Sequence, residues 1–215
     1  MKYSITALVA LASAATAHFT LGYPAVRGFD EDKLGQFPCG SFDTVSATRT
    51  PWPLTGGSIG LEMGHVSSTI QVTIAFGNNP GSSFNTILKR PISQNGLGSF
   101  CMTGITLPSN VNVTSGSNAT IQVITNGDPS GGLYNCADIT FSSTVTEPSS
   151  DVCRNNTGVT ATVAASQRQP NETTSGSTTG GATPSPTAKS GAVNLHAGVS
   201  GLILAGLAGV FVVVL

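Results

Sequence analysis

Short segments in which apolar and polar residues alternate recur along the chain. In the segment 70–76, four large apolar residues are separated by polar or small ones, and the run ends at a Gly-Asn-Asn-Pro turn. The pattern returns at 120–125 and at 137–141. Alternation with a period of two is typical of half-buried β-strands, and no long stretch keeps a helical period. The pattern predicts an all-β fold, an antiparallel β-sandwich, with room for one short helical turn at 83–88.

The amino-terminal segment differs from this pattern. Residues 1–17 combine the basic Lys2, a short apolar run and the small residues Ala15 and Ala17, in the order of a secretory signal peptide. The apolar run is too short to span a bilayer. Cleavage after Ala17 is therefore expected, and it would make His18 the first residue of the mature protein.

The carboxyl-terminal segment also differs. Residues 154–190 are rich in Thr, Ser, Gly and Pro and hold almost no large apolar residues, so they are predicted to form a disordered stalk. Residues 191–215 end in an uncharged apolar run after small residues, which is the order of a removed GPI-anchor signal with Ser190 as the attached residue. A transmembrane helix is the alternative, although the run is short for one. The folded domain is left as residues 18–153.

Charge and cysteine usage narrow the class of protein. The 9 basic and 10 acidic residues give a net charge of −1, which does not favour nucleic acid as a partner. Four cysteines in a secreted chain predict two disulfides, with three pairings open. We favour Cys39–Cys153, which would join the ends of the domain, and Cys101–Cys136, which would tie neighbouring strands. Sequons for N-glycosylation occur at Asn112, Asn118, Asn155 and Asn171.

The candidate chemistry depends on two histidines. As a free amino terminus, His18 would offer a metal its α-amino nitrogen and its ring Nδ1, and His65 would add a third nitrogen from a strand edge or loop. Copper(II) prefers such nitrogens in a tetragonal arrangement with a further oxygen ligand. Asp138 is the candidate oxygen ligand, because a carboxylate inside an apolar strand needs a metal or a polar partner. The alternatives are an ordinary surface histidine at His65 and a hydrogen-bonded structural aspartate at Asp138.

Several segments carry a family resemblance. They are His18-Phe-Thr-Leu-Gly-Tyr-Pro24, Arg27-Gly-Phe-Asp-Glu31, Phe37-Pro-Cys-Gly40 and, most specifically, the run Gly-Leu-Tyr-Asn-Cys-Ala-Asp-Ile-Thr at 132–140. With these segments the chain resembles the fungal GPI-anchored proteins that are similar to lytic polysaccharide monooxygenases, also called the copper acquisition factor family. The resemblance implies an immunoglobulin-like β-sandwich with one copper ion held by His18, His65 and Asp138. It also implies a part in copper uptake or homeostasis without oxidative cleavage of polysaccharides.

These observations predict a monomeric copper-binding protein, not an enzyme, that a GPI lipid holds at the outer face of the plasma membrane or in the cell wall. A membrane copper transporter is the expected delivery partner. A copper-dependent polysaccharide monooxygenase is the first alternative; one Trp and three Tyr give it little aromatic surface for docking a glycan. A metal-free structural wall protein is the second alternative, and it leaves the two histidines and the aspartate unexplained.

Overall fold

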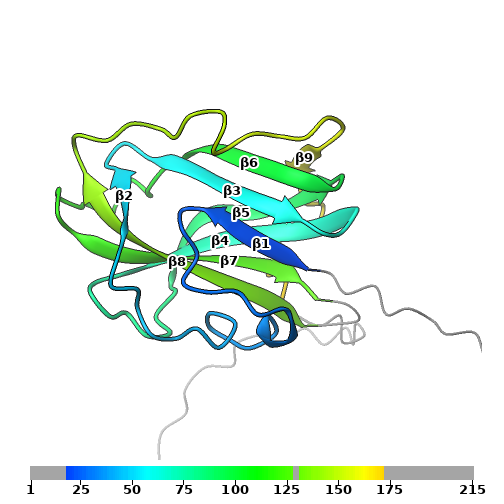
Figure 1. The fold of residues 1–215 in the computed structure, drawn as a ribbon, viewed down its shortest axis with the longest axis horizontal. Helices are drawn as coiled ribbons and strands as arrows, with labels where there is room; N and C mark the ends of the chain where they lie inside the picture. Colours follow the sequence, from blue (N-terminus) through cyan, green and yellow to red (C-terminus); the bar gives the residue numbers. More distant parts are fainter. Residues whose placement is uncertain (1–17, 128–130, 172–215) are drawn as a thin grey trace, which may run out of the picture. The chain divides into compact units, whose positions relative to one another are not determined.

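Two β-sheets face each other in the computed structural model, which describes residues 18–127 and 131–171 (Figure 1). The strands are β1 (Phe19–Tyr23), β2 (Thr50–Pro53), β3 (Gly57–Met63), β4 (Ser67–Phe76), β5 (Thr86–Asn95), β6 (Gly98–Ile105), β7 (Asn118–Asn126), β8 (Gly132–Ser142) and β9 (Thr160–Val163), and a 3-10 helix, η1, spans Glu31–Lys33. One sheet has the order β1-β3-β6, and the other has the order β2-β8-β7-β4-β5-β9. The predicted all-β sandwich is confirmed.

The alternating apolar residues of the strands form the core between the two sheets. The apolar residues of β4, β7 and β8 that point toward the three-stranded sheet are almost fully buried; they are Ile70, Val72, Ile74, Ala119, Ile121, Val123, Ala137, Ile139 and Phe141. Burying such side chains is worth roughly 1.5–3 kcal/mol each for the larger ones. The three alternating segments recognised in the sequence therefore lie in β4, β7 and β8, as predicted.

The outer face of the six-stranded sheet is also covered, which the alternation did not predict. Thr120, Gln122 and Asp138 point away from the core, yet they are 0%, 1% and 2% exposed. The long connection between β1 and β2, blue in Figure 1, crosses this face, and Gln122 Nε2 donates to Pro38 O at 2.8 Å. Strands that the alternation predicts to be half-buried are thus buried on both faces, because the β1–β2 connection covers the outer face of the sheet.

Two further details differ from the expectations. The strand β2 pairs with β8 in parallel, so the sandwich is not antiparallel throughout. No helical turn forms at 83–88: residues 83–85 follow a turn at 81–82 without regular structure, and β5 begins at Thr86. The single short helix among the described residues is η1, where Asp30 provides the cap by accepting a hydrogen bond from Asp32 N at 3.2 Å.

The favoured disulfide pairing is wrong. The bonds are Cys39–Cys136 and Cys101–Cys153, with Cα–Cα distances of 5.1 Å in both. Cys101 lies in β6 of the three-stranded sheet and Cys136 in β8 of the other sheet, so they are not on neighbouring strands. Each bond instead fixes a long connecting segment to a strand: Cys39–Cys136 holds the β1–β2 connection on β8, and Cys101–Cys153 holds the segment after β8 on β6.

The predicted domain boundary at Cys153 is too early. Residues 160–163 form β9, which pairs with β5 and adds an edge strand to the six-stranded sheet. Beyond it, Ala164 N donates to Pro91 O at 3.1 Å, and Ala164 is 6% exposed. Main-chain pairing thus orders a segment whose composition offers few apolar side chains. The predicted signal peptide 1–17, the residues 172–190 of the stalk, Ser190 and the anchor signal 191–215 lie outside the described residues. In the described part of the chain, no helix is long and apolar enough to cross a membrane.

The four sequons are not equivalent in the fold, and unequal glycosylation is expected. Asn112 and Asn155 are exposed, whereas Asn118 Nδ2 donates to Asn78 Oδ1 at 2.8 Å and Asn118 Oδ1 accepts from Thr140 at 2.5 Å. A glycan on Nδ2 would disturb this pair, so we expect lower occupancy at Asn118 than at Asn112 and Asn155. Glycopeptide mass spectrometry of the secreted protein measures this, and full occupancy at Asn118 would contradict it. Asn171 is half-buried with an enclosed Oδ1.

Candidate metal centre

The backbone of His18 pairs with that of Gly64, the residue before His65, at one end of the sandwich. His18 immediately precedes β1, and its carbonyl oxygen accepts a hydrogen bond from Gly64 N at 2.9 Å, continuing the pairing of Phe19 with Met63. A side chain at position 64 would come within 2.9 Å of that carbonyl, so only glycine permits the close approach. His65 is the next residue, in the short connection between β3 and β4. The backbone thus pairs His18 with the residue next to His65, although 46 residues separate the two histidines in the sequence.

A carboxylate that the sequence reasoning did not select lies against His18. The Nδ1 atom of His18 contacts Oε1 of Glu31, the first residue of η1. The His18 side chain is 21% exposed and that of Glu31 is 55% exposed, so the pair is open to solvent. Nδ1 is the ring atom that an amino-terminal chelate would use. Glu31 is therefore an oxygen donor next to the proposed nitrogen ligands.

Main-chain bonds to β8 on both sides of Glu31 hold η1 in place. Before it, Arg27 N donates to Cys136 O at 2.9 Å, and after it, Leu34 O accepts from Tyr134 N at 2.8 Å. Leu34 is 1% exposed, so the turn is also fixed by an apolar contact. The disulfide at Cys136 adds a covalent link to the same strand. A short polar turn that would otherwise be mobile is thereby positioned beside the start of β1.

Asp138 has a different set of partners. Its Oδ2 accepts from Arg27 Nε at 2.7 Å and from Ser46 N at 2.8 Å, and its Oδ1 accepts from Arg27 at 2.8 Å and from the Thr120 hydroxyl at 2.6 Å. The Arg27 and Asp138 side chains are 3% and 0% exposed. Arg49 Nη1 lies 3.7 Å from the same carboxylate. This arrangement is a buried, bidentate ion pair with its remaining lone pairs occupied.

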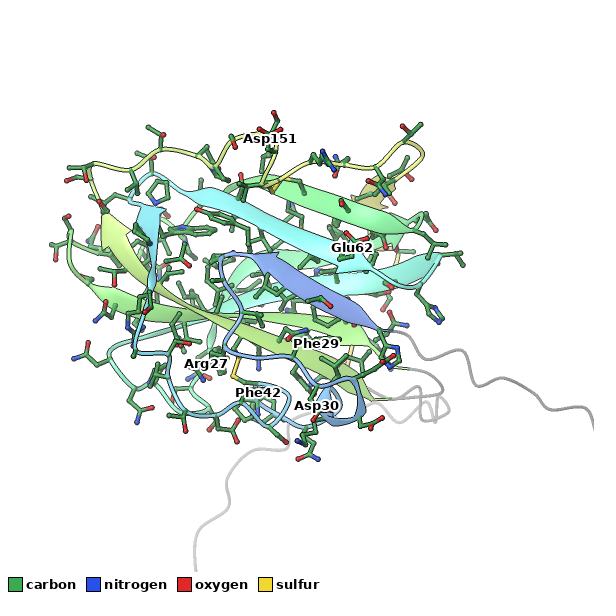
Figure 2. All side chains as sticks on the ribbon, in the orientation of Figure 1. Arg27, Phe29, Asp30, Phe42, Glu62 and Asp151 are labelled. Carbon is green, nitrogen blue, oxygen red and sulfur yellow. A yellow bond between two sulfur atoms is a disulfide. The ribbon has the colours of Figure 1, made fainter. Side chains whose placement is uncertain are left out.

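The surroundings of Asp138 favour its ionised form at neutral pH. Burial alone raises the pKa of this carboxyl, but hydrogen bonds from Arg27, Thr120 and Ser46 and the charge of Arg27 outweigh burial and leave the pKa below its usual value. The neighbouring residue Gly28 allows this packing, because a side chain there would collide with the Phe42 ring. Figure 2 shows Arg27 and Phe42 in the connection that lies beneath the six-stranded sheet.

Strand geometry puts Asp138 on the face of β8 opposite to the one that contacts β1. In β8, Asn135 points toward the three-stranded sheet, and its Nδ2 donates to Phe19 O at 3.1 Å. Successive residues of a strand point to opposite faces, so Asp138, three residues later, points the other way. The register between β7 and β8 is regular across these positions. Asp138 is therefore on the outer face of the sheet, whereas the face of β8 that meets β1 carries Asn135.

The residues fit copper only in part. The His18 nitrogens, His65 and the Glu31 carboxylate are the nitrogen and oxygen donors that copper(II) prefers. No three His, Cys, Asp or Glu side chains converge on a common point within residues 18–127 and 131–171. A metal would therefore require the half-exposed His18 and His65 side chains and the exposed Glu31 side chain to turn toward it. Met63 is 2% exposed in the core and is not available as a ligand.

The signal for Glu31 was present in the sequence but could not be used. Glu31 lies in an acidic stretch with Asp30 and Asp32, in a loop with no periodic pattern. Arg27 belongs to one of the segments that carry the family resemblance, but nothing in the sequence indicates that it pairs with Asp138. The charged group that explains Asp138 lies 111 residues earlier in the chain, so only the folded sheet shows the pair.

Known proteins match this chain over most of its length. The sequence model of the family described as copper acquisition factor BIM1-like matches residues 16–158. An uncharacterized protein of Aspergillus fumigatus is 44% identical over 182 residues, which cover 81% of this chain and 75% of the relative. Copper acquisition factor BIM1 of Cryptococcus neoformans var. grubii is 39% identical over 162 residues, 71% of this chain and 72% of the relative. A lytic polysaccharide monooxygenase-like protein X325 of Hypocrea jecorina is 30% identical over 163 residues, 66% and 70% respectively.

Proposed function

The chain belongs to the BIM1-like copper acquisition factor family, and on this basis we propose that it is an extracellular copper-binding protein whose cargo is held by the mature amino terminus. The observation that supports the proposal most is the hydrogen bond from Gly64 N to His18 O, because Gly64 immediately precedes His65. Copper is the metal that the family description connects with this fold.

Three nitrogens would bind the ion. After removal of residues 1–17, His18 supplies its α-amino nitrogen and Nδ1, and His65 supplies one ring nitrogen. Imidazole and amine ligands of this kind suit copper, whereas thiolates are excluded here because all four cysteines form disulfides. The described residues leave the histidines half-exposed, so copper can enter and leave from solvent. Exchange with solvent suits a protein that passes copper on.

The proposed location follows from the sequence. The signal peptide and the GPI-anchor signal with Ser190 would place the protein on the outer face of the plasma membrane, as a monomer, with a membrane copper transporter as the receiving partner. Release of the protein from intact cells by a phosphatidylinositol-specific phospholipase C tests this location. Retention after the enzyme has released a known GPI-anchored marker would count against the anchor.

Oxidative catalysis is the second candidate function, because several relatives are named as similar to lytic polysaccharide monooxygenases. Copper-loaded protein incubated with chitin or β-glucan, a reductant and hydrogen peroxide distinguishes the two functions. Oxidised oligosaccharides detected by mass spectrometry would favour the enzyme. We expect none above the level obtained with free copper.

Copper stoichiometry is the direct test of the amino-terminal site. The mature protein, with His18 verified as the first residue by mass spectrometry, is expected to hold one copper ion by elemental analysis, with a nitrogen-rich EPR spectrum. One additional residue before His18 should remove the α-amino ligand and abolish stoichiometric binding. The variant His65→Ala should bind more weakly, whereas Val66→Ala, a change at a neighbouring residue that is 65% exposed, should not. Equal copper content in the native and extended proteins would refute the proposed ligands.

A further inference from the structure

The family resemblance implies Asp138 as the oxygen ligand to copper, but in the fold Asp138 lies on the outer face of β8 in an ion pair with Arg27. Resting on the proposed function, we infer that Glu31 supplies the oxygen ligand to copper and that Asp138 is a positioning residue. In its positioning role, Asp138 holds the connection that carries Glu31. Three features of the structure support these roles: the contact at Nδ1 of His18, the hydrogen bonds that occupy the Asp138 carboxylate, and the two main-chain bonds that hold η1.

The contact at Nδ1 sets up an exchange of partners. Nδ1 of His18 cannot donate a hydrogen to Glu31 and give its lone pair to copper at the same time. When copper takes Nδ1, the Glu31 carboxylate loses its partner while η1 still holds it next to the ion. A negatively charged oxygen beside a copper(II) ion is a favourable ligand, and the exposed Glu31 side chain has the freedom to adjust.

Asp138 cannot take this role without the loss of a buried ion pair. Both of its oxygens already accept two hydrogen bonds, from Arg27, Thr120 and Ser46. Moving the carboxylate to the opposite face of β8 would leave the Arg27 guanidinium buried without its counter-charge, which is strongly destabilising. Glu31 has no comparable barrier, because it is already beside His18.

The positioning role follows from the path of the chain. Arg27 joins Asp138 through its side chain and β8 through its backbone, four residues before Glu31. Ser46 N joins the same carboxylate near the other end of the connection. Asp138 therefore binds two points of the β1–β2 connection on either side of η1. Loss of this carboxylate would loosen the support of Glu31 without touching the metal.

The decisive experiment compares two matched charge removals in one turn, with copper(II) alone as the probe. Glu31→Gln removes the carboxylate at Nδ1, and Asp32→Asn removes the same charge from the next residue, which is also exposed. We expect Glu31→Gln to weaken copper(II) binding at least about tenfold and to change the copper hyperfine splitting in EPR, by analogy with losses seen for residues that support metal ligands. Asp32→Asn should match the native protein in both measurements.

The outcomes separate the inference from the proposed function. If the native protein binds copper and Glu31→Gln has the native affinity and EPR spectrum, Glu31 is not a ligand and the inference is overturned. Asp138→Asn adds a second arm: a folded variant that keeps the native EPR spectrum supports positioning, and a folded variant that loses the copper signal refutes it. If Asp138→Asn does not fold, the comparison of Glu31→Gln with Asp32→Asn decides by itself whether Glu31 is a ligand. No copper on the native protein overturns the proposed function itself, and with it this inference.

Discussion

Replacement of Arg27 by methionine is expected to destabilise the fold by about 3–5 kcal/mol at neutral pH, because it leaves the Asp138 carboxylate buried without its counter-charge. Chemical denaturation followed by tryptophan fluorescence measures the change, since the single Trp is 2% exposed in the core. The hydrogen bonds from Thr120 and Ser46 remain, so the carboxylate is not wholly unsatisfied.

The pH dependence of this loss has a definite sign. In the native protein the pKa of Asp138 lies below its usual value, so the ionised form stabilises the fold above the usual carboxyl range, and this contribution is lost as pH falls through the folded pKa. Without Arg27, two of the causes that lower this pKa are lost while burial, which raises it, remains, so the pKa of Asp138 should be higher than in the native protein. The cost of Arg27→Met should therefore shrink as the medium becomes acidic enough to protonate Asp138.

A double variant controls for the loss of packing. Replacing both partners, as Arg27→Met with Asp138→Leu, removes the buried charge as well as its counter-charge. Exchange of a whole buried ion pair for apolar residues costs much less than removal of one partner. The double variant should thus be more stable than Arg27→Met alone. A double variant that is less stable than the single one would show that the ion pair is not the source of the effect.

Removal of the Cys39–Cys136 disulfide is expected to cost about 4.5–5 kcal/mol, because the bond closes a loop across a sequence separation of 97 residues in the unfolded chain. Substitution of both cysteines by alanine, followed by thermal unfolding, measures the loss. The same double substitution at Cys101 and Cys153, with a separation of 52, should cost about 4 kcal/mol.

Copper binding should distinguish the two disulfides although their stabilities are similar. Cys39–Cys136 fixes the connection that carries Glu31, whereas Cys101–Cys153 fixes the segment after β8 on the other sheet. Titration with copper(II) at a temperature where both variants are folded should show weaker binding only without Cys39–Cys136. Equal weakening in both would mean that general loosening, rather than the position of Glu31, sets the affinity.

The core strands could be predicted from the sequence because the alternation that marks them lies within a few neighbouring residues. Alternation at 70–76, 120–125 and 137–141 reports which side of each strand faces the core between the sheets, and each segment lies within a strand of the structure. The edge strand β9 could not be found in this way, because its four residues are all exposed and main-chain pairing with β5 defines it. Its composition resembles the stalk, so a boundary based on composition was placed too early.

The candidate site was only partly predictable for the same reason. His18 and His65 stand out because histidine is rare in this chain, and the backbone does bring them to one end of the sandwich. Asp138 stands out as a charge in an apolar strand, yet its partner Arg27 is far away in sequence. The disulfide pairing depends on which strands lie in which sheet, and spacing along the chain does not contain that information.

The hydrogen bond between Gly64 and His18 has a consequence for the end of the mature chain. Chain termini ordinarily fray, and a ligand that depends on one must first restrict its motion. Here the residue expected to become the terminus is paired through its carbonyl to Gly64, directly after β3, and the next residue, Phe19, is 1% exposed in the core. An ion arriving at His18 would thus meet a chain end whose backbone is already held in place. Binding of the ion would therefore cost little conformational entropy of the chain end.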